Sequence, residues 1–393
     1  MIKVGVGYSL SSSWERGAEE AARMAMHRAR IRRADLALVF CTLSHHDGFR
    51  GVLRQVRSAT LADQLVGCSG LGILTQECEV ELEPGIAVMV LASNQVTLSP
   101  VHFQNIQERS EVFGGNLGEL CGGQPLKNPL VLLFADTFCF DPPSFFRSLR
   151  ASGNVPVIGA GASEDGTRSH TFQFFNEEVM EGSVVGAIFS GQFRHRVGIT
   201  QACHPVGQAM IVTQAEQSRI LELGGRKASE LLQETFEGLE EKLRAAGGRI
   251  FLAYPSNPGE TRLARGKYLV RNITGIDPEG AISVSEEIPE GQVVYFCLRD
   301  ARRSKEDLQK MLAELQEAEK GEPPIFGLYF NCCGRGSSLY ENSDVDVKAI
   351  RKTLGDFPLV GFASYAEFAP IGLENRYHNY SGVLTLFWKE APL

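Results

Sequence analysis

The sequence predicts a mixed α/β protein, built from repeated strand–helix–strand–strand units that form mixed sheets covered by helices in two halves. Apolar runs that end in glycine and small residues occur three times, at 65–69, 157–163 and 359–364. Another apolar run precedes each of them, at 36–41, 130–135 and 325–330, and a third follows, at 86–92, 183–190 and 383–388. Such an internal repeat predicts the architecture, and it places a Gly/Ser-rich strand end at the same point of every copy, where α/β proteins tend to bind ligands.

The first copy opens with a strand at the N-terminus. Residues 15–30 are rich in alanine and follow Ser12 and Ser13, two candidate N-caps, which indicates a helix. The next elements expected are a buried strand, a helix and a returning strand, at 36–41, 49–61 and 65–69. A strand–helix–strand passage predicts a parallel pair with a right-handed crossover.

The second copy is expected at 129–191, where the helix 142–152 starts with two prolines, which a first turn tolerates. The polar segment 192–205 then indicates a boundary, so we expect two halves, 1–195 and 205–393. The second half should start with a hairpin, a helix and four strands, at 208–222, 225–246, 249–254, 267–273, 281–285 and 292–299.

An amphipathic helix is expected at 304–319, because Leu308, Met311, Leu312 and Leu315 share one face. Pro323 and Pro324 end it, and the third copy follows.

Charge and composition exclude several classes of protein. A net charge of −8 argues against a surface for nucleic acid or anionic membranes. The N-terminus shows no signal-peptide pattern, and no apolar run approaches the roughly 20 residues of a membrane helix. The nine cysteines are scattered and odd in number, which favours free thiols in a reducing compartment. The sequence therefore predicts a cytoplasmic protein without membrane insertion.

The usual catalytic signatures are missing from the sequence. The segment 161–165 fails the G-x-S-x-G pattern at its last position, and Glu164 stands where a dinucleotide fingerprint needs its third glycine. Neither a P-loop nor a C-x-x-C or H-E-x-x-H motif is present. We therefore predict no catalytic residue and no metal ligand, and expect a protein that is not an enzyme.

The segment 331–336 directly follows a buried apolar run and is the most distinctive motif. Its predicted ligand contacts are Asn331, Cys332, Gly334, Arg335 and Gly336. Glycines beside an arginine let the backbone approach a ligand, while the guanidinium offers a planar fork suited to a carboxylate. The alternative is a tight turn with a solvated arginine and two buried thiols.

A cysteine nucleophile is a further alternative for this motif. A neighbouring cation such as Arg335 can lower the pKa of a thiol, so Cys332 or Cys333 would be the reactive group of a cysteine-dependent enzyme. Adjacent cysteines at a strand end are more often packing residues.

Polar groups also gather after the third glycine turn, where a pocket needs a few of them on apolar walls. These candidates are Gly361, Ser364, Tyr365, Glu367 and His378. Further candidates are Arg271 and Arg299 as anion contacts and Ser69 and Ser163 as contributors from the first half. In the alternative interpretation, Glu367 caps a helix.

The chain resembles the FIST proteins, which carry a FIST N-terminal and a FIST C-terminal domain. The resemblance rests on the alanine-rich first helix, the run 36–41 and the turns at 67–69 and 159–163, and on the later segments 225–228, 268–271, 275–277, 291–292, 299–300, 331–336 and 361–370. The Asn-Cys-x-Gly-Arg-Gly element at 331–336 is the most specific. Two departures concern the ligand: Ala366 stands where the family usually has glycine, and Tyr380 follows His378-Asn379 where the family often has threonine.

The resemblance implies a sensory module in signal transduction that binds a small molecule such as an amino acid and signals through a separate partner, for example a histidine kinase. The halves 1–195 and 205–393 would be its FIST N-like and FIST C-like domains. Because some relatives bind haem and report nitric oxide, a haem sensor is the alternative. The histidines open to that role are His27, His45, His46, His102, His170, His195, His204 and His378. A scaffold that is recognised by another protein is a further alternative.

Overall fold

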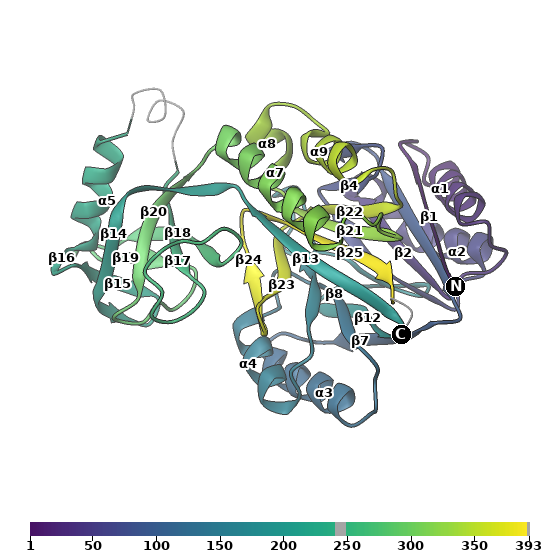
Figure 1. Cartoon of the computed structure of the whole chain (residues 1–393), viewed down its shortest axis with the longest axis horizontal. Coiled ribbons are helices and arrows are strands. Elements are labelled where there is room, and N and C mark those ends of the chain that lie inside the picture. Colours follow the sequence, from purple (N-terminus) through teal and green to yellow (C-terminus); the bar gives the residue numbers. More distant parts are fainter. Residues whose placement is uncertain (240–248, 391–393) are drawn as a thin grey trace. The chain divides into compact units, whose positions relative to one another are not determined.

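A computed structural model describes residues 1–239 and 249–390 (Figure 1). These residues form two compact units. The first, the repeat unit, contains Met1–Ile199, Gln309–Tyr377 and the chain from Gly382 on. The second, the barrel unit, contains Thr200–Leu308 and His378–Ser381.

The repeat unit is built from three copies of one pattern, as the internal repeat predicts, but the second and third copies begin earlier than expected, at Val96 and Phe193. The first copy consists of β1 (Ile2–Ser9), α1 (Trp14–Ala29), β2 (Leu36–Thr42), the 3-10 helix η1 (Leu43–Gly48), α2 (Phe49–Thr60), β3 (Gln64–Gly70), β4 (Gly72–Thr75), β5 (Glu79–Glu81) and β6 (Ile86–Ser93). The second consists of β7 (Val96–Gln104), α3 (Ser110–Gly122), β8 (Leu130–Ala135), α4 (Pro142–Ser152), β9 (Val157–Gly161), β10 (Gln173–Phe175), β11 (Glu178–Met180) and β12 (Ser183–Gly191). The third consists of β13 (Phe193–Gln201), α7 (Ala301–Ala318), β21 (Phe326–Cys332), α8 (Gly336–Tyr340), α9 (Val345–Leu354), β22 (Leu359–Ser364), β23 (Ala366–Ile371), β24 (Glu374–His378) and β25 (Ser381–Lys389).

The three copies exchange hairpins in a cycle. Each copy forms a four-stranded core sheet, with strand orders β1-β6-β2-β3, β7-β12-β8-β9 and β13-β25-β21-β22. The inner pairs β2–β3, β8–β9 and β21–β22 are parallel, as the strand–helix–strand passages predict. Each sheet is then extended by the hairpin of another copy: β10–β11 joins β3, β23–β24 joins β9, and β4–β5 joins β22. Every copy therefore contains a mixed sheet, in which a parallel pair of strands lies at the centre and antiparallel strands lie at the edges.

One glycine per copy sets the spacing of the parallel pair. Gly67, Gly159 and Gly361 lie opposite Val39, Leu133 and Tyr329 in the register. A Cβ at any of these glycines would overlap the carbonyl oxygen of the opposite residue. The next residues on the neighbouring strands form the centre of the core, where the ring centroids of Phe40, Phe134 and Phe330 lie 5.2 to 6.4 Å apart.

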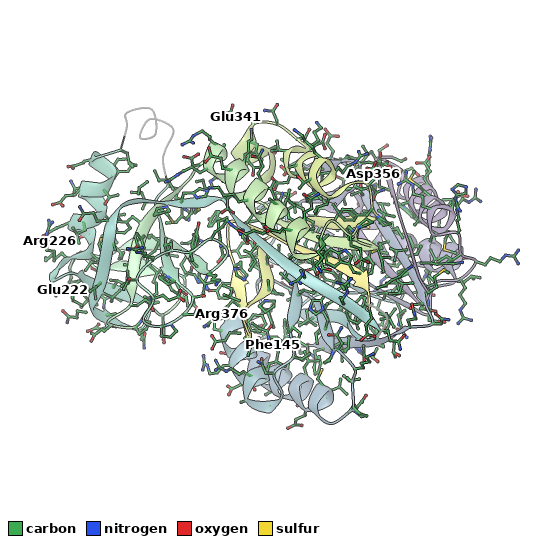
Figure 2. The ribbon with its side chains drawn as sticks, in the orientation of Figure 1. Phe145, Glu222, Arg226, Glu341, Asp356 and Arg376 are labelled. Carbon is green, nitrogen blue, oxygen red and sulfur yellow. The ribbon has the colours of Figure 1, made fainter. Side chains whose placement is uncertain are left out.

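Helices cover the outer faces of these sheets. The alanines of α1 are fully buried, and a Cβ at Gly5 or Gly7 of β1 would overlap the backbone of α1, so small residues on both sides permit this approach. Ser13 caps α1 by accepting a hydrogen bond from the Arg16 amide. Helices α3 and α4 pack closely because Gly114 lies against the backbone carbonyl of Phe145, which Figure 2 labels on α4.

The barrel unit has an antiparallel sheet that closes on itself. It contains β14 (Cys203–Glu216), β15 (Arg219–Leu223), β16 (Arg226–Lys227), α5 (Ala228–Glu237), β17 (Phe251–Pro255), β18 (Tyr268–Ile276), β19 (Ile282–Val284) and β20 (Val293–Arg299). The strand order is β14-β20-β17-β18-β19-β15-β16, and β14 also pairs with β15. The predicted hairpin and strands are confirmed. The helix expected at 225–246 is found as α5, and residues 240–248 lie outside the described residues.

The chain first passes from the repeat unit to the barrel unit between Ile199 and Thr200, inside the polar segment 192–205 that indicates a boundary in the sequence. The part that follows Leu308 returns to the repeat unit, apart from residues 378–381. The predicted apolar face of α7 is buried in full. Across residues 1–239 and 249–390, no helix combines the length and apolar character needed to cross a membrane.

Candidate functional site

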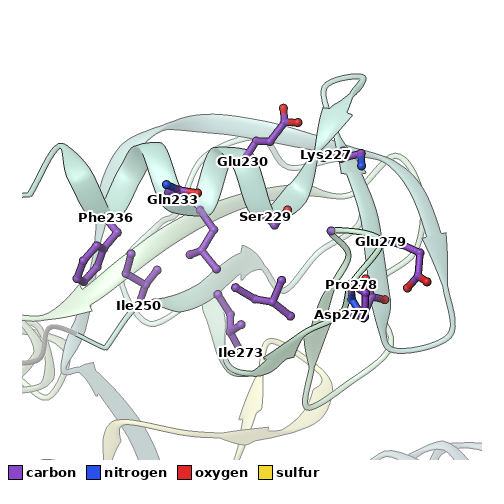
Figure 3. A pocket seen from close by; sticks show the side chains of 13 residues that line it. Lys227, Ser229, Glu230, Gln233, Phe236, Ile250, Ile273, Asp277, Pro278 and Glu279 are labelled. Atoms are coloured by element: carbon purple, nitrogen blue, oxygen red, sulfur yellow. The ribbon is translucent and has the colours of Figure 1, made fainter.

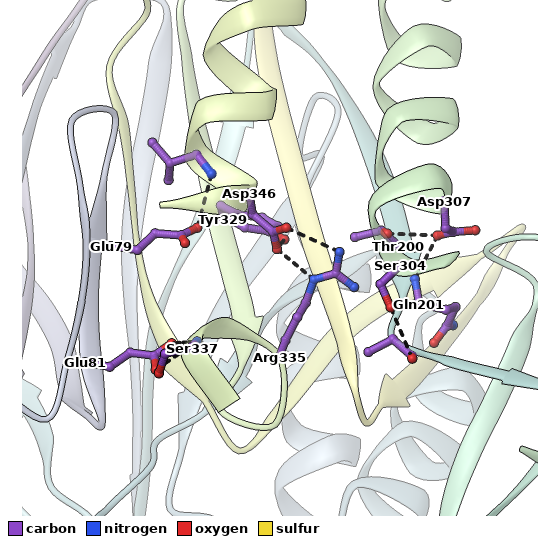
Figure 4. A network of polar contacts seen from close by, with 12 residues as sticks. Glu79, Glu81, Thr200, Gln201, Ser304, Asp307, Tyr329, Arg335, Ser337 and Asp346 are labelled. Atoms are coloured by element: carbon purple, nitrogen blue, oxygen red, sulfur yellow. Dashed lines mark hydrogen bonds and ion pairs between the residues drawn. The ribbon is translucent and has the colours of Figure 1, made fainter. Parts of the chain in front are cut away.

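The guanidinium of Arg335 is buried inside the repeat unit and pairs with Asp346 at the start of α9 (Figure 4). Its Nε lies 2.7 Å from Asp346 Oδ2, and its Nη2 lies 3.4 Å from Oδ1. Tyr329 donates its hydroxyl to the same carboxylate at 2.7 Å, and the ring of Tyr340 lies 5.7 Å from the guanidinium carbon. Burial alone would lower the pKa of Arg335, but Asp346 raises it well above its ordinary value. The guanidinium that was expected to bind an anionic ligand therefore pairs with Asp346 of the protein itself. The alternative of a tight turn with a solvated arginine is also wrong, because Arg335 is buried.

The glycine after Arg335 also faces a carboxylate of the protein. Glu81 of β5 accepts hydrogen bonds from the amide and the hydroxyl of Ser337, and a Cβ at Gly336 would overlap its carboxylate. Glu79, two residues earlier, is buried and accepts a hydrogen bond from the Val347 amide at 3.2 Å (Figure 4). The loop 331–336 is thus held by the hairpin that the first copy contributes to the third sheet.

Predicted site residues from the second and third copies meet where β9, β21 and β22 end. We call Ser163, Cys332, Ser364, Tyr365 and Glu367 the strand-end cluster. The Ser163 hydroxyl donates to the Ala363 carbonyl, and the Ser364 hydroxyl donates to Glu367 Oε1 at 2.7 Å. Cys332 Sγ lies 3.9 Å from the Tyr365 carbonyl oxygen, and the Tyr365 amide donates to Gly161 O at 3.1 Å. Ser364 and Glu367 are fully buried, whereas the Tyr365 side chain is exposed.

Other predicted residues lie outside this cluster. Ser69 accepts a hydrogen bond from the Phe172 amide at 3.1 Å, which fixes the segment leading to β10. Asn331 is buried within β21, and Gly361 lies within β22. Gly334 lies in the turn before α8.

Three predicted residues belong to the barrel unit. Arg271 is buried, pairs with Glu286 and lies 5.8 Å from the Tyr254 ring. Arg299 is exposed at the end of β20. His378 is buried. A separate polar network in this unit connects Asp307 to Thr200 and Gln201 (Figure 4).

The barrel unit also contains a cavity of about 710 Å³ between α5, the strand β18 and the turn 277–280 that follows β18 (Figure 3). Its apolar lining comes from Leu232, Phe236, Ile250, Ile273 and Ile276. Its polar lining includes Lys227, Ser229, Glu230, Gln233, Asp277 and Glu279.

Two of the cavity's apolar side chains stay partly open to solvent. Phe236 is 39% exposed and Ile276 is 58% exposed. In α5, only Ala228 is fully buried. The charged lining is partly neutralised within the unit, since Arg219 pairs with Asp277 and lies 4.0 Å from Glu279, and Arg226 lies 3.8 Å from Glu230. Volumes of 300 to 1,000 Å³ and a mostly apolar lining with a few polar groups are typical of small-molecule sites, and barrel mouths are a common place for them.

The described lining of this cavity does not suit haem. No histidine, cysteine or methionine occurs among its described residues, so none of them could serve as an axial ligand. Within the described part of the chain, no three His, Cys, Asp or Glu side chains are placed to hold a metal ion.

Lys227, Ile273 and the other lining residues were missed as ligand contacts by sequence reasoning. The segments 225–228 and 275–277 belong to the pattern of the family resemblance, which was the signal available in the sequence. Nothing in the sequence shows that these two segments face each other, because only the pairing of strands in the barrel brings them together.

Comparison with known proteins agrees with this description. The family model of the FIST N domain matches residues 35–226, and that of the FIST C domain matches residues 228–370. An uncharacterised protein of Mycobacterium tuberculosis (strain ATCC 25618 / H37Rv) is 29% identical over 395 residues, covering 98% of this chain and 100% of the relative. One of Mycobacterium bovis is 28% identical over 98% of this chain and 99% of the relative. One of Methanocaldococcus jannaschii is 21% identical over 90% of this chain and 74% of the relative.

Among solved structures, the chain is similar to the crystal structure of a cyanuric acid hydrolase from A. caulinodans, with 10% identity, full coverage of both chains and a TM-score of 0.37. A likeness this low supports no conclusion about activity. The two family models together cover nearly the whole sequence. The chain therefore belongs to the FIST family, a family of sensory domains.

Proposed function

We propose that this protein is a sensory protein that binds a small, amino-acid-like carboxylate in the cavity of the barrel unit. The observation that carries the proposal is the cavity of about 710 Å³ between α5, the strand β18 and the turn 277–280. Its volume lies within the range of small-molecule sites. Family membership supports a sensory role rather than catalysis.

The lining suits a molecule with an apolar body and charged ends. Ile250, Ile273 and Ile276 offer an apolar wall. Lys227 supplies a cation for a carboxylate, and Glu230 or Glu279 supplies an anion for an ammonium group. Burying the apolar body against the isoleucines would contribute about 25 cal/mol per Å².

The test is a thermal-shift screen of amino acids and organic acids, followed by calorimetric titration of each hit. Lys227→Met keeps an apolar stem but removes the cation, so we expect carboxylates to bind about tenfold more weakly, which corresponds to about 1.4 kcal/mol. Lys310→Met, on the exposed face of α7, is the matched control and should leave binding unchanged. Gln233→Trp should fill the cavity and prevent binding. Glu237→Trp is the matched control, because Glu237 is on the same helix but is not among the described lining residues.

The same screen separates this site from the strand-end cluster, which stays a predicted site. Glu367→Gln replaces the buried carboxyl group that accepts the Ser364 hydroxyl with an amide. If Glu367→Gln abolishes the shift while Lys227→Met and Gln233→Trp retain it, the ligand binds at the cluster and the barrel proposal is wrong. If no compound shifts the wild type, the proposal is also wrong.

We further propose that the signal is passed to a separate protein in the cytoplasm, for which a histidine kinase is the candidate. Membership of a family of sensory domains supports this proposal. Ligand-dependent capture of purified histidine kinases would test this, with Gln233→Trp as the variant that should no longer respond.

A further inference from the structure

Two adjacent cysteines lie at the end of β21, where the chain leaves the sheet of the third copy. Cys332 is the last residue of the strand and is buried, and Cys333 follows it and is partly exposed. The Cys333 amide donates to Ser364 O at 2.7 Å, and the Cys332 carbonyl accepts from the Arg335 amide at 2.7 Å. The backbone of both residues is therefore fixed, with Cys332 at the end of the strand and Cys333 in the turn that follows.

The two thiols interact with each other. A hydrogen bond from the Cys332 side chain lowers the pKa of Cys333, against the effects of burial and of the nearby Glu367. Burial instead raises the pKa of five other cysteines, namely Cys41, Cys68, Cys78, Cys121 and Cys139. Since the thiolate is the reactive form, Cys333 stands apart from these five.

We propose that Cys332 and Cys333 form a reversible redox site that reacts with hydroperoxides. The Cys333 thiolate attacks the terminal oxygen of a hydroperoxide, the O–O bond breaks, and an alcohol or water leaves after taking up a proton. Cys333 is now a sulfenic acid. The Cys332 thiol then attacks its sulfur, the S–S bond forms, and the hydroxyl leaves as water. Two thiols are oxidised and one hydroperoxide is reduced.

A disulfide between neighbours is strained, which makes the site reversible. Consecutive Cα atoms lie about 3.8 Å apart across a trans peptide, whereas disulfides usually join Cα atoms about 4.4–6.8 Å apart. Strained disulfides are more easily reduced and are often regulatory. Closing the ring would twist the 332–333 peptide, whose N–H donates to Ser364 O and whose carbonyl accepts from the Arg335 amide, so oxidation would alter the strand-end cluster.

The experiment uses the full chain and hydrogen peroxide as the probe, with mass spectrometry of the digest under non-reducing conditions. We expect the peptide that contains residues 332 and 333 to lose two hydrogen atoms, the protein to lose two titratable thiols, and dithiothreitol to restore both. Cys333→Ser should abolish the change. Cys332→Ser should leave Cys333 as a sulfenic acid that dimedone traps. Cys139→Ser, at another partly exposed cysteine, should behave as the wild type.

Two outcomes would overturn the proposal. In one, the 332–333 peptide stays reduced while Cys139 or Cys78 is oxidised. In the other, Cys333 pairs with a cysteine other than Cys332. Neither outcome depends on ligand binding in the barrel unit.

Discussion

Gly361 shows how a single hydrogen atom in place of a side chain determines the packing of a strand pair. It lies opposite Tyr329 in the parallel pair β21–β22, and a Cβ would overlap the Tyr329 carbonyl oxygen. The carbonyl belongs to the backbone of a buried strand and cannot move aside. Gly361→Ala should therefore lower the free energy of unfolding by about 3 kcal/mol or more, measured by urea denaturation.

Gly122→Ala is the matched control for this change. Gly122 ends α3, and a Cβ there would meet its nearest neighbour at an ordinary van der Waals distance of 3.6 Å. Alanine is the better helix former, so this variant should be neutral or slightly more stable. Equal losses for both variants would contradict the proposed clash.

Glu79 makes stability depend on pH. Its pKa is raised well above the ordinary value, first because it is buried and then because Asp346, Glu81 and Asp344 lie close by. A carboxyl whose pKa is raised by folding stabilises the native state below its unfolded pKa, and that contribution is lost as pH rises towards the folded pKa. Glu79→Gln stays neutral and can still accept from Val347 N.

We therefore expect Glu79→Gln to be more stable than wild type at neutral pH, with a difference that shrinks as pH falls towards the ordinary range of a glutamate. Urea denaturation at a series of pH values measures it. A constant difference across this range would show that Glu79 does not titrate abnormally.

At the scale of elements, helix α1 depends on its cap as well as on its alanine face. Ser13 accepts a hydrogen bond from the Arg16 amide at 3.2 Å, which satisfies one amide of the first turn. Ser13→Ala should cost about 1 kcal/mol in the free energy of unfolding. Ser58 is exposed on α2 and does not cap a helix, so Ser58→Ala should leave the free energy of unfolding unchanged. Similar costs would mean that the cap is unimportant.

Helix α5 differs from α1 in how little of it is buried, although Leu231, Leu232 and Phe236 give it an apolar face. The cavity lies along this face. The sequence predicted a helix here, and its open face became apparent only when β18 and the turn 277–280 were placed beside it.

At the scale of the whole molecule, each compact unit has hydrophobic cores of its own. We therefore expect two transitions in a calorimetric unfolding scan. Leu132→Ala, in the core of the repeat unit, should lower one of them, and Ile282→Ala, in the core of the barrel unit, should lower the other. Each should cost about 2–5 kcal/mol. A single transition that both variants lower equally would contradict independent units.

The sequence alone determined that the pattern occurs three times, the core strands of each copy, and the first helix with its cap, because hydrophobic periodicity, glycine placement and N-cap residues act over a few neighbouring residues. It did not predict the exchanged hairpins or the helices α3, α8 and α9. It also brought together Ser163 and Ser364 as candidates, since both follow glycine turns of the repeat. Only the tertiary structure decided which hairpin extends which sheet, because each exchange joins strands from different copies. It likewise decided that Arg335 faces Asp346 and that a cavity opens beside Lys227. A buried charge takes whichever opposite charge the packed chain brings within reach, and that depends on contacts between elements rather than on spacing along the sequence.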